Sequence, residues 1–198
     1  MPDAPVAIMK AVLTLPPASP DPDVRSAESG ALWRAGLARL GGPAAEALDR
    51  LAGDVGIGPG SAGPTGVVRF DDLRVAAASA LAALDGTSPA GALAGAIAPL
   101  VMLCGNDASG PDGLIGLAAL AVRRDDVAAA AVFAGEALRL APGHPRAACL
   151  AGFAALAAGD RKGAQQLLAG TARLARRRPE YREDLRAAQQ LLLIMHLT

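Results

Sequence analysis

Three prolines recur at a constant spacing in the second half of this chain. Pro111, Pro145 and Pro179 are each 34 residues apart, and Asp126 and Asp160 keep the same spacing. Two stretches with helical periodicity lie within each period, which is typical of helix–turn–helix repeats that stack side by side. Each such hairpin completes its core only against its neighbours. The period therefore predicts an extended stack whose surface holds another molecule, rather than a site for chemistry.

The composition favours helices over sheets. Hydrophobic residues make up 52% of the chain and aromatic residues only 3%. Alanine and leucine supply much of the apolar share and rank highest in helix propensity, whereas strands favour aromatic and β-branched residues. The formal charge is zero, so no overall field directs the protein to nucleic acid or membrane. The charge is uneven, however: residues 160–198 are net +4 and the remainder is net −4.

The cysteines and the N-terminus indicate where the protein works. Cys104 and Cys149 are 45 residues apart, each within an apolar helical pattern, which matches no zinc or redox motif. We interpret them as small buried hydrophobic residues in a reducing compartment. Asp3 and Lys10 interrupt the apolar N-terminal stretch, so it does not read as a signal peptide. The expected location is the cytoplasm.

The helical pattern divides the chain into three parts. Residues 1–23 are rich in Pro, Ala and Asp and predict a flexible arm, although the apolar run 7–15 is able to dock on the rest of the protein. Residues 24–104 predict a degenerate helical-hairpin region that contains the glycine-rich loop 53–66. Residues 111–198 predict regular repeats. The fold class is all-α with no strand, and nine helices are expected at about residues 23–40, 43–52, 71–84, 88–104, 111–123, 126–140, 145–158, 160–177 and 179–197.

The 34-residue period, the pair Ala151-Gly152 and Pro142 give the segment 127–174 a pattern that resembles the tetratricopeptide repeat (TPR) family. Ala151-Gly152 lies where the family places a large residue followed by a small one, and Pro142 closes the first repeat. Small residues stand where the two helices of a pair approach closely: Ala118, Ala130, Gly152 and Ala164. The resemblance covers repeats 111–144 and 145–178 and a capping helix, 179–198, with weaker echoes at 29–52 and 71–104. It implies stacked antiparallel helix hairpins in a right-handed α-solenoid. The chain departs from the family where alanine replaces the large aromatics of the first helix.

The resemblance also implies a site, because the first helices of such repeats line a concave groove. The groove is apolar with an arginine rim, and it lacks the Lys/Asn set with which some family members hold a terminal carboxylate. We therefore expect it to bind an amphipathic helix or an extended segment with acidic residues. The expected groove residues are Asp112, Ile115, Ala119, Val122, Arg123, Arg146, Cys149, Phe153, Leu156 and Ala157.

Other motifs are weaker. Gly58–Gly63 fits G-x-G-x-x-G, but a helix precedes it and Pro64 follows, which favours a plain loop. Residues 86–106 carry no charge and have the length of a membrane helix, but prolines and glycines interrupt them, which favours a buried helix. The cluster Arg173, Arg176, Arg177 and Arg178, with Arg182 and Arg186 after it, complements a helix C-terminus or meets an acidic partner.

The sequence therefore predicts a non-catalytic interaction module, an adaptor, scaffold or export-type chaperone. No catalytic constellation, metal set or cofactor motif is present, and no nucleic-acid partner is expected. The alternatives are a subunit of an enzyme complex such as a glycosyltransferase system, and a membrane-associated assembly factor. The apolar run 191–195 near the C-terminus predicts self-association through the last helix.

Overall fold

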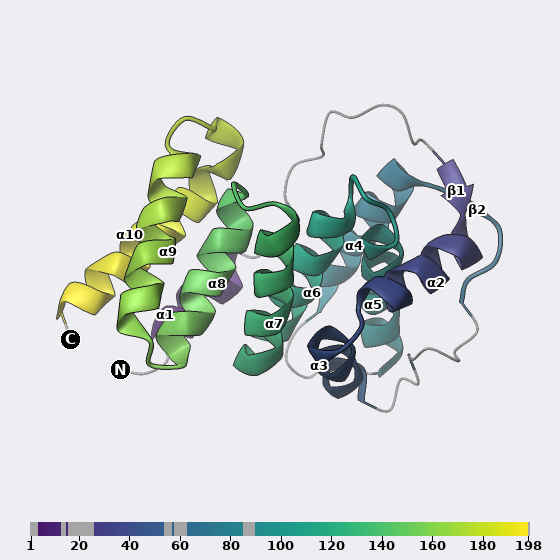
Figure 1. The fold of residues 1–198 in the computed structure, drawn as a ribbon, viewed down its shortest axis with the longest axis horizontal. Helices are drawn as coiled ribbons and strands as arrows, with labels where there is room; N and C mark the ends of the chain where they lie inside the picture. Colours follow the sequence, from purple (N-terminus) through teal and green to yellow (C-terminus); the bar gives the residue numbers. More distant parts are fainter. Residues whose placement is uncertain are drawn as a thin grey trace.

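Helices make up almost all the regular structure of the part of the chain that the computed structural model describes, residues 4–12, 15, 26–53, 57, 63–84 and 90–197 (Figure 1). The helices are α1 Ala4–Val12, α2 Ser29–Arg39, α3 Pro43–Ala52, α4 Phe70–Ala83, α5 Ala90–Cys104, α6 Gly110–Arg123, α7 Val127–Leu140, α8 Pro145–Ala157, α9 Arg161–Ala175 and α10 Arg182–Leu197. A short 3₁₀ turn, η2 Pro179–Tyr181, precedes α10. The predicted all-helical class and the nine expected helices are confirmed.

The repeated residues start the helices. Asp126 accepts a hydrogen bond from the backbone N–H of Ala129 at 2.9 Å and so caps α7. Asp160 does the same for α9, through Gly163 at the same distance. Pro145 occupies the first turn of α8, where its missing N–H is no loss. These side chains satisfy donors that a helix start leaves unpaired, which is why local sequence predicts the helix starts well.

Neighbouring helices pack in sequence order along most of the chain. Each helix from α4 to α10 packs against the next, while α2 lies on α5 and α3 on α7. In Figure 1 the helices of the second half stand side by side in a row, from α6 through α7, α8 and α9 to α10. The core is continuous along this row and is built largely from alanine and leucine.

Small residues set the helix spacing. A Cβ atom on Gly152 of α8 would lie 2.8 Å from Cγ of Leu168 on α9. A Cβ on Gly36 of α2 would collide with the carbonyl oxygen of Val101 on α5. Neither separation is open to a real side chain, so these glycines let the helix pairs approach closely. Ala130 and Ala164 on the second helices are fully buried, as the pattern predicted.

The N-terminal half differs from expectation in two ways. First, a pair of three-residue strands is present that the sequence pattern did not predict: β1 Ser26–Glu28 pairs antiparallel with β2 Val67–Arg69, and α2 begins only at Ser29. The Ser29 N–H and hydroxyl both donate to the Gly66 carbonyl, at 2.8 Å each, which joins segments far apart in sequence.

Secondly, residues 4–12 of the segment predicted as a flexible arm form the helix α1. Its Met9 side chain is 2% exposed, so packing against the body, rather than the local composition, decides the structure of this segment. Most of the predicted glycine-rich loop 53–66, including residues 58–62 of the G-x-G-x-x-G motif, lies outside the described residues.

Candidate functional site

The expected groove residues lie mostly in the interior. Seven of the ten have 6% or less of their surface exposed, and Ile115, Cys149 and Phe153 have none. Arg123 and Leu156 are half-buried, and Ala157 is exposed. The expectation that these side chains line an open groove is therefore wrong, whereas their binding of a partner stays a prediction. The buried seven are Asp112, Ile115, Ala119, Val122, Arg146, Cys149 and Phe153.

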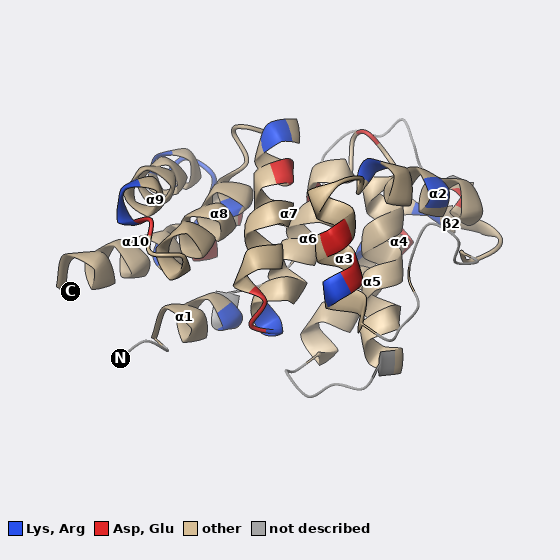
Figure 2. Ribbon diagram, turned by 60° about the horizontal axis from the view of Figure 1, so that its bottom comes forward, with Lys and Arg blue, Asp and Glu red and all other residues tan. Residues whose placement is uncertain are grey.

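The chain's own N-terminal helix lies over this region. α1 packs against α6, α8 and α10, whose common surface we call the first-helix face (Figure 2). Met9 joins the core there, and a Cβ on Gly116 of α6 would lie 3.1 Å from Cδ2 of Leu15. Lys10 Nζ forms an ion pair with Asp125 Oδ1 at 2.8 Å, at the turn that follows α6. The sequence pattern did not reveal this contact, because it joins residues more than a hundred positions apart.

The arginines of the predicted rim are structural. Arg146 on α8 makes two hydrogen bonds of 2.7 Å with the Asp184 carboxylate on α10, and both side chains are almost wholly buried. Arg74 on α4 forms an ion pair through Nη1 with Oδ2 of Asp112 on α6. Burial raises the pKa of Asp112 above its usual range, although Arg74 opposes the shift. Arg123 donates to the Leu84 carbonyl at 3.2 Å.

A histidine–tyrosine contact lies near these pairs. The Nδ1 atom of His144 accepts the N–H of Ala147 and caps α8, and Nε2 is 3.3 Å from the Tyr181 hydroxyl. Because Nδ1 is an acceptor, the ring proton of the neutral form belongs on Nε2. Burial, followed by the charges of Arg146 and Arg178, lowers the His144 pKa to about 4. The histidine is therefore a neutral cap that joins α8 to η2, not a general base at neutral pH.

The two cysteines are equally unreactive in this setting. Both thiols are free and fully buried. Burial raises the pKa of Cys104 to about 12 and raises that of Cys149 as well. A thiolate is the nucleophilic form, so neither side chain is equipped for catalysis. Within the described residues, no group of three or more His, Cys, Asp and Glu is arranged to hold a metal ion.

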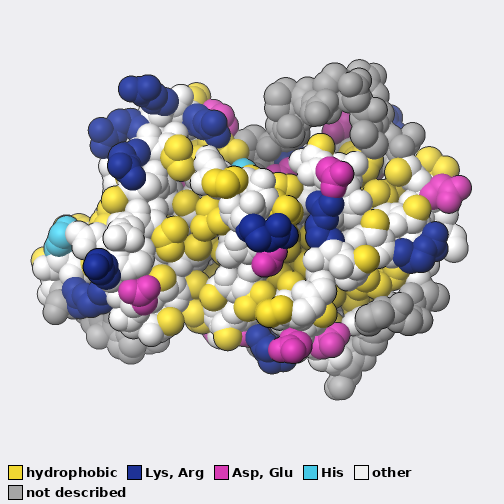
Figure 3. Space-filling view, viewed as in Figure 1, with side chains coloured by type: hydrophobic (Ala, Val, Ile, Leu, Met, Phe, Trp, Pro, Cys, Tyr) yellow, Lys and Arg dark blue, Asp and Glu magenta, His cyan; other side chains and the backbone are white. Residues whose placement is uncertain are grey.

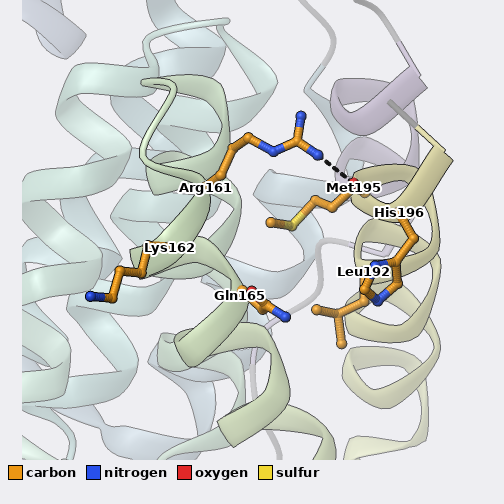
Figure 4. Close-up of a pocket in the computed structure, with 6 residues that line it drawn as sticks. All are labelled: Arg161, Lys162, Gln165, Leu192, Met195 and His196. Carbon is orange, nitrogen blue, oxygen red and sulfur yellow. Dashed lines mark hydrogen bonds between the residues drawn. The ribbon is translucent and has the colours of Figure 1, made fainter.

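A pocket of about 340 Å³ opens between the start of α9 and the end of α10 (Figure 4). The Arg161 guanidinium donates to the Met195 carbonyl and so caps the end of α10. The Lys162 side chain points away from His196 on the far wall. The cationic groups do not converge on one point, and we assign this pocket no ligand.

A second hollow is apolar and lies on the other helices. It has a volume of about 450 Å³ and is bordered by α7, the turn after α7, one residue of α8 and the part of α9 from Gln166 to Leu174. Figure 3 shows hydrophobic atoms over this part of the row and Lys/Arg side chains gathered at the end where α9 finishes. We call it the second-helix groove, and its lining residues are Leu138, Pro142, Ala148, Gln166, Leu167, Gly170, Arg173 and Leu174.

The apolar run of the last helix is partly buried. In the run 191–195, Leu191 is fully buried and Met195 nearly so, whereas Leu193 is 59% exposed. Within the described part of the chain, no helix combines the length and hydropathy needed to cross a membrane. Comparison with protein-family models, with curated proteins and with solved structures finds no match to this chain.

Proposed function

We propose that this chain is a TPR-like protein-interaction module whose first-helix face binds a short apolar helix of a partner protein. The TPR-like arrangement is supported by helix bounds that follow the 34-residue period and by helix pairs that pack against the next pair. The buried ion pairs support it as well. Arg74 pairs with Asp112 and Arg146 with Asp184, both across 38 residues, so each pair crosses about one repeat.

The observation that carries the proposal is α1 itself. It is a helix of nine residues seated on α6, α8 and α10. Isolated helices shorter than about 12–15 residues are marginal in water, so α1 owes its structure to the face beneath it. That face is therefore able to fold and hold a short apolar helix.

The α1 contacts also indicate the chemistry of a partner. Met9 is the buried anchor, and burial of such a side chain stabilises docking by about 1.5–3 kcal/mol. The Lys10–Asp125 pair is more exposed, at 36% and 65%, and contributes about 0–1 kcal/mol. A partner helix with a Met or Leu anchor followed by a basic residue would reproduce both contacts. The acidic partner expected from sequence does not fit here, because Arg146 is already paired.

The test uses a labelled synthetic peptide of residues 1–15 and full-length protein carrying Met9→Asp. This change weakens the docking of the protein's own α1 and leaves the face intact. We expect the peptide to bind the variant about tenfold or more tightly than wild type, because α1 no longer competes. A peptide with the same Met9→Asp change is the control and is expected not to bind.

Circular dichroism and the melting temperature show whether the variant is folded. If it is folded and the wild-type peptide does not bind, the proposal is wrong. If it does not fold, Lys10→Glu takes its place, because the reversed charge faces Asp125 and weakens α1 more gently. In that case an Asp125→Lys protein is expected to bind a peptide carrying the Lys10→Glu change better than the unchanged peptide, and the opposite order would contradict the proposal.

A further inference from the structure

The second-helix groove is separate from the face that α1 covers. Its walls are α7 and α9, and Ala148 of α8 lies between them. On α9 the lining residues Gln166, Gly170, Arg173 and Leu174 recur at helical spacing, so they form one stripe along the helix. Leu138 of α7 and Leu167 and Leu174 of α9 line this space. The main packing of α7 is against α6 and α8, and that of α9 is against α8 and α10. Exposed apolar surface that is contiguous often marks an interaction site on a soluble protein, so the stripe predicts that a partner binds here.

We infer that the second-helix groove binds an extended segment of a partner protein in which an apolar side chain is flanked by acidic residues. The apolar anchor fits between Leu138, Leu167 and Leu174. Leu174 is 36% exposed, so part of the apolar surface of the groove is open to a partner. Gly170 leaves room for the anchor, since a Cβ placed on it would meet no atom within 4 Å. A cavity of about 450 Å³ accommodates one or two large side chains.

The arginines at the end of the groove favour a segment that carries acidic residues. Arg173 forms part of the groove wall, and Arg176 and Arg177 follow at the end of α9, all three exposed. In the described part of the chain, none of these three guanidinium groups takes part in an ion pair. On α7, Arg139 is already paired with Glu136 at 2.8 Å. The positive charge is therefore concentrated at the α9 end, where an acidic residue next to the anchor would lie.

The helix dipole alone does not account for this cluster. A cation in the last turn stabilises the helix by about 0.3–1 kcal/mol, and one or two cations are enough to complement the helix dipole. Nucleic acid is the less favoured occupant, because binding of single strands relies on exposed aromatic rings for stacking. Tyr181 is only 7% exposed and Trp33 only 4%. An apolar groove beside the arginines is instead the arrangement that recognises an apolar anchor with acidic neighbours.

The experiment selects peptides from a random-peptide display library on the immobilised full-length protein. We expect enrichment of sequences with a Leu, Met or Phe next to Asp or Glu. Gly170→Trp fills the groove from a helical position that has open space, so the fold should persist. It is expected to reduce the affinity of a selected peptide more than tenfold. Gly135→Trp is the matched control: Gly135 also has open space around its Cβ direction but does not line the groove, and this variant is expected to bind normally.

A second pair of variants tests the charge. Arg173→Glu is expected to lower the affinity about tenfold, whereas Arg34→Glu, an equal charge change on an exposed residue of α2, is expected to have little effect. The inference is overturned if no peptide is enriched, or if selected peptides bind Gly170→Trp and Arg173→Glu as well as wild type. It is also overturned if a single-stranded oligonucleotide binds with strong salt dependence and competes with the selected peptides. None of these outcomes bears on the proposed function of the first-helix face, because that proposal is tested with a different peptide.

Discussion

Arg146 and Asp184 meet through two parallel hydrogen bonds, Nε to Oδ1 and Nη2 to Oδ2, each 2.7 Å long. Their side chains are 5% and 3% exposed, and they tie α8 to α10. A buried charge is tolerated only when a partner and hydrogen bonds compensate for the lost water. The loss of either residue would strand the other charge in the interior.

We predict that Arg146→Met lowers the free energy of unfolding by about 3–5 kcal/mol, because it leaves Asp184 unpaired. The double variant Arg146→Met/Asp184→Leu is expected to recover much of this loss. Urea unfolding at neutral pH measures both. Arg186→Ala removes the exposed Arg186–Glu183 pair and serves as the control, with an expected change below about 1 kcal/mol. A loss for Arg146→Met no larger than that of the control would contradict the prediction.

Replacement of glycine by alanine should have opposite effects on the stability of the protein at two positions. Gly152→Ala brings a Cβ to 2.8 Å from the buried Leu168 side chain, so we expect it to destabilise the protein by about 1–3 kcal/mol. Gly135→Ala lies on an open side of α7 and should stabilise the protein by about 0.5–1 kcal/mol, because alanine loses less backbone entropy in a helix. Thermal melts of the two variants measure the contrast. Equal melting temperatures would argue against close packing at Gly152.

The two aspartate caps should act independently. Asp126→Ala and Asp160→Ala each remove one capping hydrogen bond at the start of a helix, and each is expected to lower the stability by about 1 kcal/mol. Asp126→Ala also removes a partly exposed ion pair with Arg50 at 3.7 Å, which adds at most about 1 kcal/mol. The caps belong to different helices and share no partner, so the double variant should lose the sum of the two effects. Denaturant titration of the three variants tests this. Replacement by Asn, which also caps, should restore most of the stability.

The histidine cap of α8, His144, predicts that the stability of the fold depends on pH. Its pKa lies at about 4 in the folded protein and near 6.5 in the unfolded chain, so the unfolded chain binds the proton more readily between these values. The neutral histidine therefore stabilises the fold fully above pH 6.5, and this contribution is lost as the pH falls towards 4. His144→Asn keeps an acceptor for the cap but does not titrate. Unfolding curves from pH 7 to pH 4 should fall more steeply for wild type than for this variant; parallel curves would exclude the effect.

Local signals predicted much of the fold. The spacing of Pro145, Asp126 and Asp160 placed the helix starts within one or two residues, because capping and proline effects depend only on nearby residues. The strand β1 was missed, since its three residues are ordered by β2 and by the bonds of Ser29 to Gly66, some 37 positions away. The composition of residues 4–12 predicts a flexible arm rather than the helix α1 for the same reason: the structure of this segment depends on distant helices.

The sequence by itself determined the helices from α2 to α10 and the small residues at which they meet, since each follows from neighbours one or two turns away. Only the tertiary structure decided which apolar face stays open. An exposed groove and a covered core require the same apolar pattern on α6 and α8, so Ile115 and Phe153 look alike in either case. Packing of α1 buries one face, and the spacing of α7 and α9 leaves the other hollow. Both results arise from contacts between segments far apart in the chain, which no local pattern records.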